Sequence, residues 1–251
     1  MIHSIAFPKE YYKSQIMFFH HVNLDALKNP RIVPLFGPNG SGKTTMLKAM
    51  EDTFTIQNHL KKYKDDEDFN WFKKATEKDL IRKGCVLEMD DIPHRVLGYT
   101  NSEQNFKNAR PHDLFSIASK WDAKSLSEGQ SIVYSVMGLF DILKPGKEMT
   151  KEENGELIIL IDELDSGLSI DNLDMFMRKL KYILRKRDDI QIFFSFNNPR
   201  VLKFFPEVIS MYDGKILTLH SDEDMLNEMR KHKKEFNKAR RKSNGMPKVY
   251  D

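Results

Sequence analysis

The segment RIVPLFGPNGSGKTTMLKAM (31–50) decides how the chain folds. It begins with the short apolar run RIVPLF, passes through the glycine-rich stretch GPNGSGKTT (37–45) and continues with helical spacing. A strand, a tight loop and a helix in this order bring several backbone N–H groups and a helix amino terminus to one point. The segment therefore predicts a phosphate-binding loop between a buried strand and a helix.

The stretch GPNGSGKT matches the pattern G-x-x-x-x-G-K-[ST]. Its glycines let backbone N–H groups turn inward around phosphates, where a Cβ would obstruct. We expect Lys43 to reach the β and γ phosphates of a nucleoside triphosphate and Thr44 to ligate Mg²⁺. The predicted nucleotide contacts in this loop are Gly37, Pro38, Asn39, Gly40, Ser41, Gly42, Lys43, Thr44 and Thr45.

Length, charge and cysteine content narrow the class of protein. A chain of 251 residues suits one sizeable α/β domain. Its 40 Lys and Arg nearly balance 37 Asp and Glu, so the charge predicts no overall nucleic-acid surface. The single cysteine, Cys85, excludes an internal disulfide framework and favours a reduced, cytoplasmic protein. No run of about 18 apolar residues occurs, so we expect no membrane span.

The remaining apolar runs predict an α/β fold with a mostly parallel sheet flanked by helices. ELIILIDEL (156–164) and IQIFFSF (190–196) are nearly continuous apolar runs, which are typical of strands buried on both faces. Residues 172–187 between them form an amphipathic helical pattern. The tail from Ser221 also has a helical pattern and becomes strongly basic. These elements predict a main domain over 1–220 and a basic C-terminal helix and tail over 221–251.

Two further segments predict an antiparallel β portion. Residues 208–219 read as a hairpin across an Asp-Gly turn. CVLEMD (85–90) and RVLGYT (95–100) read as a pair of strands across the turn DIPH.

The carboxylates Asp162 and Glu163 follow an aliphatic strand pattern. We expect Asp162 to hold Mg²⁺, directly or through water, and Glu163 to orient and deprotonate the attacking water. Taken alone, the pair would also fit a buried strand that ends in a solvated acidic turn. Its position after a phosphate loop favours the catalytic interpretation.

The segment LSEGQ (126–130) indicates the class of NTPase. It resembles the signature of the ATP-binding-cassette (ABC) ATPases, typically LSGGQ, with Glu128 in place of the first glycine. In that family the signature caps the γ-phosphate held by the opposite subunit. The resemblance thus implies a head-to-tail dimer around two ATP molecules, with Ser127, Gly129 and Gln130 as nucleotide contacts. A helix capping box, Ser127 with Gln130, is compatible with the same residues.

The resemblance also implies an ABC-ATPase head, with a helical signature subdomain inserted at about 50–130. SGLS (166–169) resembles the family's D-loop, but Ser169 stands where Asp is usual. In SFNNPR, Asn197 occupies the position of the switch histidine; Asn can donate a hydrogen bond to a γ-phosphate but cannot carry charge. A plain strand-end turn with an Asn cap remains the alternative. Gln104 is a candidate Mg²⁺ or water contact, although the sequence does not separate it from an ordinary loop glutamine.

The branch of the family is indicated by DELDSGL and by the helix after the signature, which contains no arginine. Both are closer to the soluble chromosome-maintenance, RecF-like and overcoming-lysogenization-defect-like ATPases than to transporter subunits. The resemblance implies a cytoplasmic ATPase that dimerises on ATP and regulates or loads a separate effector protein, in anti-phage defence or DNA repair. The alternatives are the ATP-binding subunit of an ABC transporter and a weakly hydrolysing ATP sensor.

The basic segment MRKHKKEFNKARRK (229–242) has two interpretations. It could contact nucleic-acid phosphates, but it carries no sequence readout because aromatic residues are not interleaved with its basic ones. A solvated helix face or a dock for an acidic partner explains the same residues at least as well.

Overall fold

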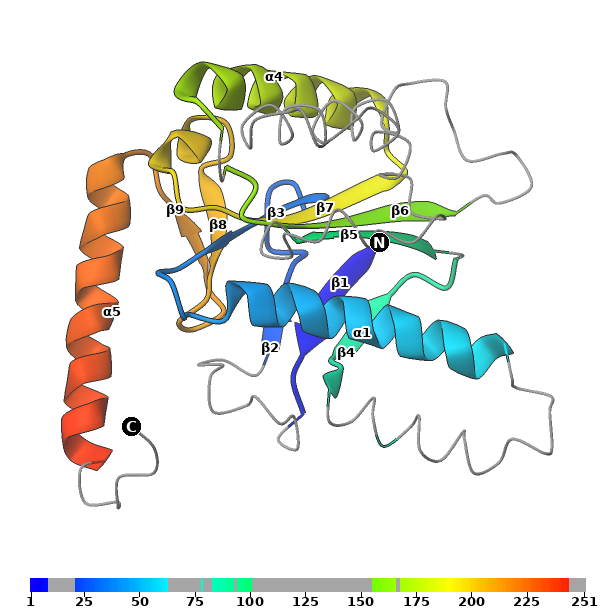
Figure 1. Cartoon of the computed structure of the whole chain (residues 1–251), viewed down its shortest axis with the longest axis horizontal. Helices are drawn as coiled ribbons and strands as arrows, with labels where there is room; N and C mark the ends of the chain where they lie inside the picture. The colour runs from blue at the N-terminus through cyan, green and yellow to red at the C-terminus, as the bar shows by residue number, and fades with distance from the viewer. Residues whose placement is uncertain are drawn as a thin grey trace, which may run out of the picture.

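The computed structural model describes residues 1–8, 21–62, 78, 83–92, 94–100, 155–165 and 168–243. Its centre is a six-stranded sheet in the order β5-β6-β7-β3-β8-β9 (Figure 1). All neighbouring pairs are parallel except β8 and β9. The strands are β3 (Ile32–Phe36), β5 (His94–Thr100), β6 (Glu156–Asp162), β7 (Ile190–Ser195), β8 (Glu207–Ser210) and β9 (Ile216–Thr218). The predicted mostly parallel sheet is confirmed.

A second, antiparallel sheet has the order β2-β1-β4, with β1 (Ile2–Ala6), β2 (His21–Asn23) and β4 (Val86–Met89). The strands β1 and β2 were not predicted, because they are short and carry no turn signal between them. Gln191 of β7 joins the two sheets. Its Oε1 accepts from the Ile2 N–H at 2.7 Å, and its Nε2 donates to the Ile2 carbonyl at 2.9 Å.

The predicted pairing of 85–90 with 95–100 is wrong. The two strands exist, but β4 pairs with β1 and β5 pairs with β6. β5 runs in parallel register with β6 along its whole length, from His94 opposite Glu156 to Thr100 opposite Asp162. This partner lies far away in the sequence, so a local turn pattern could not reveal it. The hairpin within 208–219 is confirmed as β8 and β9, and Gly214 in its turn has φ 69°.

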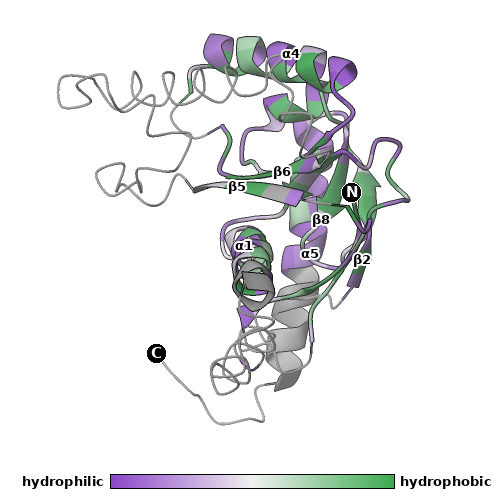
Figure 2. Cartoon of the chain, turned by 90° about the vertical axis from the view of Figure 1, so that its right-hand side faces the viewer, coloured by the Kyte–Doolittle hydropathy of each residue, from purple (hydrophilic) through white to green (hydrophobic). Residues whose placement is uncertain are grey.

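Helices cover both faces of the six-stranded sheet. Helix α1 (Lys43–Lys62) lies on one face and α4 (Ile170–Lys186) on the other, as Figures 1 and 2 show. Within the described ranges, the further helices along the chain are the short η5 (Pro199–Lys203) and α5 (Asp222–Ser243), which runs beside the β8–β9 end of the sheet. No helix in the described part of the chain is long and apolar enough to cross a membrane.

The continuous apolar run of β6 is explained by burial on both faces. Leu157, Ile159 and Ile161 pack in the core under α4, whereas Ile158 and Leu160 pack in the core shared by α1 and the antiparallel sheet. Because strand side chains alternate between faces, a strand between two helical layers is apolar at every position. This arrangement holds the carboxyl ends of β3, β6 and β7 rigidly at one edge of the sheet.

Candidate functional site

The loop after β3 has the backbone that its glycines predict. Gly40 and Gly42 have φ of 82° and 96°, a region that favours glycine. A Cβ added to Gly37 would lie 2.4 Å from Ser41 Oγ, so position 37 has no room for a side chain. The Ser41 N–H donates to the Pro38 carbonyl at 3.1 Å, which closes the turn. Asn39 is exposed at the loop tip, and Thr45 lies in the first turn of α1.

Lys43 is the central cation of the site and is only 7% exposed. Its Nζ donates to the carbonyls of Gly37 at 2.6 Å and Pro38 at 3.4 Å, and to Asn197 Oδ1 at 3.2 Å. The ammonium group is therefore folded back onto its own loop and touches the turn that follows β7. The structure thus brings together two residues predicted from motifs 154 positions apart.

The charge environment of Lys43 has two opposing effects. Burial lowers the pKa of its ammonium group, whereas the nearby carboxylates of Asp162, Glu163 and Asp165 raise it. Among the described residues, the hydrogen-bond partners of the Lys43 ammonium group are all neutral oxygens, so an anion can bind it without displacing an ion pair.

Asp162, at the end of β6, is 1% exposed and accepts hydrogen bonds on both carboxylate oxygens. Thr44 Oγ1 donates to its Oδ2 at 2.7 Å, and Ser195 Oγ donates to its Oδ1 at 2.6 Å. The two residues predicted to hold Mg²⁺, Thr44 and Asp162, are thus direct neighbours. Ser195, the last residue of β7, was not predicted; its position at the end of a buried strand, two residues before Asn197, was the available signal.

Glu163 has a left-handed backbone, with φ 51°. This region is uncommon for residues other than glycine, and it occurs often at functional sites. Ser195 accepts hydrogen bonds from two consecutive N–H groups of this turn. Its Oγ accepts from the Glu163 N–H at 2.6 Å, and its carbonyl accepts from the Leu164 N–H at 3.0 Å. The backbone that presents Glu163 is therefore fixed by β7.

Asp165 connects the turn after β6 to the turn after β7. Its carboxylate accepts from the Asn197 N–H at 2.9 Å and also from the Asn198 N–H. The Asn198 side chain in turn caps η5 by accepting from the Arg200 N–H at 2.9 Å. The sequence assigns no role to Asp165, because it does not reveal the contact of Asp165 with the turn 32 residues further on.

The described residues fit a triphosphate with Mg²⁺. Ser41 Oγ is buried at the loop and has no hydrogen-bond partner among the described residues. Those residues contain no cluster of three or more His, Cys, Asp or Glu that could hold a metal ion alone. A hydroxyl and one carboxylate, from Thr44 and Asp162, are donors that Mg²⁺ uses when phosphate oxygens and water complete its shell.

Several predicted site residues lie outside the described ranges. They are the signature residues Ser127, Gly129 and Gln130, the candidate metal contact Gln104, and Ser166 and Gly167 of the D-loop segment. The predicted helical subdomain falls largely in the same part of the chain.

Comparison with known proteins gives likeness of fold alone. No protein-family model and no curated protein matches the chain. One similar structure is the dimeric post-hydrolysis state of the ATP-binding cassette MJ0796 bound to ADP and Pi. It has a TM-score of 0.43 and 15% identity, over 81% of this chain and 91% of that one. Another is dimeric MJ0796, a bacterial ABC transporter cassette, with a TM-score of 0.46 and 18% identity, over 88% of this chain and 100% of that one.

Proposed function

We propose that this chain is an ATPase that binds ATP and Mg²⁺ at the carboxyl ends of β3, β6 and β7. The proposal rests on one observation: Lys43 is buried beside Asn197, while its neighbour Thr44 is bonded to Asp162. Loops that follow three separate strands thus supply a cation, a Mg²⁺ ligand pair and a polar switch residue within one small volume. This is the set of groups that phosphoryl transfer to water requires.

In the proposed reaction, the loop N–H groups and Lys43 hold the β and γ phosphates. Mg²⁺ on Thr44 and Asp162 would neutralise charge on the phosphate oxygens. Glu163 orients a water molecule and accepts its proton as the water oxygen bonds to the γ-phosphorus. The bond from that phosphorus to the β–γ bridging oxygen breaks, and ADP and phosphate leave. Asn197, released from Lys43, donates a hydrogen bond to the γ-phosphate.

Steady-state hydrolysis by the purified chain tests this proposal. We expect Mg²⁺-dependent release of phosphate from ATP, and we expect Glu163→Gln to lower kcat by about 10²- to 10⁴-fold while ATP still binds. Lys43→Ala should abolish ATP binding, measured with a fluorescent ATP analogue. Lys48→Ala is the matched control, because Lys48 is an exposed lysine on the same helix. Equal ATP binding by Lys43→Ala and Lys48→Ala would refute the site.

A second candidate function, a weakly hydrolysing ATP sensor, is favoured by Asn197. A neutral side chain at this position stabilises developing charge less than a protonated histidine would. If the chain is a sensor, ATP binds but turnover stays at background, and Glu163→Gln changes neither. Turnover that Glu163→Gln removes contradicts the sensor function.

We further propose that ATP drives head-to-tail dimerisation and that the dimer regulates or loads a separate effector, possible settings being anti-phage defence and DNA repair. Nucleic acid is a candidate partner through the basic segment 229–242, which lies within α5. Filter binding to double-stranded DNA over a salt series tests whether this segment binds nucleic acid. Affinity that falls steeply with salt supports phosphate contacts, and no affinity at low salt excludes them.

A further inference from the structure

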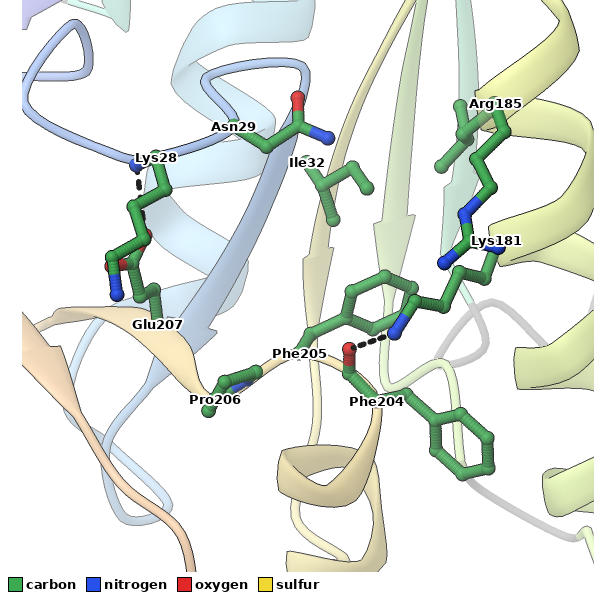
Figure 3. Close-up of a pocket in the computed structure, with 10 residues that line it drawn as sticks. Lys28, Asn29, Ile32, Lys181, Arg185, Phe204, Phe205, Pro206 and Glu207 are labelled. Carbon is green, nitrogen blue, oxygen red and sulfur yellow. Dashed lines mark hydrogen bonds and ion pairs between the residues drawn. The ribbon is translucent and has the colours of Figure 1, made fainter.

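A cavity of about 240 Å³ lies at the ends of the strands opposite to the ends that carry the nucleotide site. It is enclosed by the start of β3, the last turns of α4 and the connection from η5 to β8 (Figure 3). Because β3, β7 and β8 are parallel and the phosphate loop follows β3, the cavity lies at the amino ends of these strands. A five-residue strand separates the two sites by about 16 Å.

The floor of the cavity is apolar and well packed. Phe205 and Leu184 are 5% and 4% exposed and belong to the core under α4, and Ile32 packs against the same core. In Figure 3 the Phe205 ring and the Ile32 side chain face the interior of the cavity. An apolar floor with few polar groups is the usual lining of a small-molecule site.

The lining residues at the rim of the cavity carry more positive than negative charge. On one side, Lys28 is neutralised by Glu207: Lys28 Nζ lies 3.2 Å from its Oε1, and the Lys28 N–H donates to its Oε2 at 2.8 Å. On the other side, Lys181 and Arg185 stand four residues apart on α4. Lys181 Nζ donates to the Phe204 carbonyl at 3.4 Å.

Neither Lys181 nor Arg185 forms an ion pair with a carboxylate within the described ranges. A guanidinium group binds a carboxylate through two parallel N–H···O bonds, and an ammonium group adds a point charge. The cations stand above the apolar floor, so a ligand that satisfies both surfaces must have one charged and one apolar end.

We propose that this cavity binds a carboxylate carried on a compact apolar group. The carboxylate lies against Arg185 and Lys181, and the apolar group covers Phe205 and Ile32. The volume of the cavity is below the range of about 300–1,000 Å³ common for the sites of drug-sized ligands, which limits the apolar group to one side chain or ring. Both a free small acid and the terminal residue of a peptide have this chemistry. The site is independent of the proposed ATPase function.

Protein-observed NMR titration tests the cavity with N-acetyl-L-phenylalanine, its C-terminal amide, and the acetylated tripeptide Gly-Gly-Phe with a free carboxylate. We expect both acids to shift the amide signals of Ile32 and Phe205, with the amide compound at least tenfold weaker because it lacks the charge. Tighter binding of the tripeptide assigns the ligand to a peptide terminus. Equal or weaker binding assigns it to a free acid.

Variants on α4 make the test specific to the cavity. Arg185→Gln should weaken binding of N-acetyl-L-phenylalanine about tenfold. Lys186→Gln removes the same charge from the adjacent exposed position, which does not line the cavity, and should change the affinity less than twofold. Lys43→Ala should leave the affinity for N-acetyl-L-phenylalanine unchanged. Failure of the cavity proposal can therefore be told apart from failure of the proposed ATP site. No shifts with either acid at about 10 mM, or equal binding by Arg185→Gln, would overturn the proposal.

Discussion

Ser195 lies between the two acidic residues that the proposed chemistry uses. Its hydroxyl donates to Asp162 Oδ1 and accepts from the Glu163 N–H, both at 2.6 Å, and it is fully buried. One hydroxyl thus orients the carboxylate of the metal site and the backbone of the proposed base. Ser195 does not line the phosphate loop, so we assign it a positioning role.

Replacement of Ser195 by Ala should therefore affect turnover more than binding. We expect kcat to fall about tenfold while KM for ATP changes less than threefold, because Glu163 and Asp162 lose their shared partner. The unfolding free energy should fall by about 1–3 kcal/mol, since a buried carboxylate oxygen and a buried N–H lose their hydrogen bonds. Ser195→Thr, which keeps the hydroxyl, should recover much of kcat. A purely structural role predicts lost stability with unchanged kcat in the folded fraction.

Gly37 and Ser41 form a second pair whose contact can be tested. A Cβ at position 37 would meet Ser41 Oγ at 2.4 Å and Ser41 Cβ at 2.9 Å, inside any real contact distance. Gly37→Ala should therefore distort the loop and weaken ATP binding at least tenfold. Adding Ser41→Gly removes both atoms and should restore part of that affinity, as fluorescence titration of an ATP analogue would show. If the double variant binds no better than Gly37→Ala, steric contact with Ser41 is not the cause.

At the scale of elements, His3 in β1 links the segments on either side of it. Its Nδ1 lies 2.8 Å from Asp25 Oδ1, beyond β2, and its Nε2 lies 2.9 Å from Asp90 Oδ1, beyond β4. The hydrogen bond to Asp90 and then that to Asp25 raise the pKa of His3. A raised folded-state pKa stabilises the fold below the unfolded value of about 6.5, and this contribution is lost as the pH rises through the folded-state pKa.

His3→Asn should therefore lower Tm by about 1–3 °C at pH 5.5 and change it much less at pH 9. The effect is small because the His3 side chain is 29% exposed and its partners are about half exposed. Scanning calorimetry at the two pH values measures the difference. His21→Asn, an exposed position in the same sheet, is the control. A larger loss at pH 9 than at pH 5.5 would contradict the assigned ion pairs.

At the scale of the whole molecule, the proposed dimer can be tested by combining a variant of the described site with one of the signature segment. Glu163→Gln should bind ATP without turnover and should therefore double the mass measured by light scattering when ATP and Mg²⁺ are added. Adding Ser127→Arg to this variant should keep it monomeric while ATP affinity stays within about threefold, because the arginine would block only the opposite subunit. A monomer in both cases contradicts the composite site.

Much of the fold and part of the site could be predicted from local patterns. The strand, loop and helix of 31–50 depend on glycine conformations and apolar periodicity, which a short window of sequence contains. The burial of β6 on both faces was likewise predicted from its unbroken apolar run. Lys43, Thr44 and Asp162 were chosen by motif, and the structure places them in contact or in adjacent positions.

Only the tertiary structure decided which distant segments meet. It paired β5 with β6 rather than with β4, joined β1 to β7 through Gln191, and placed Ser195 against Asp162 across 33 residues. It also left Arg185 and Lys181 over an apolar cavity whose lining comes from three separate segments. The physical reason is that local propensity depends on a few neighbouring residues, whereas these contacts depend on strand order and on the side chains that compete for the same buried space.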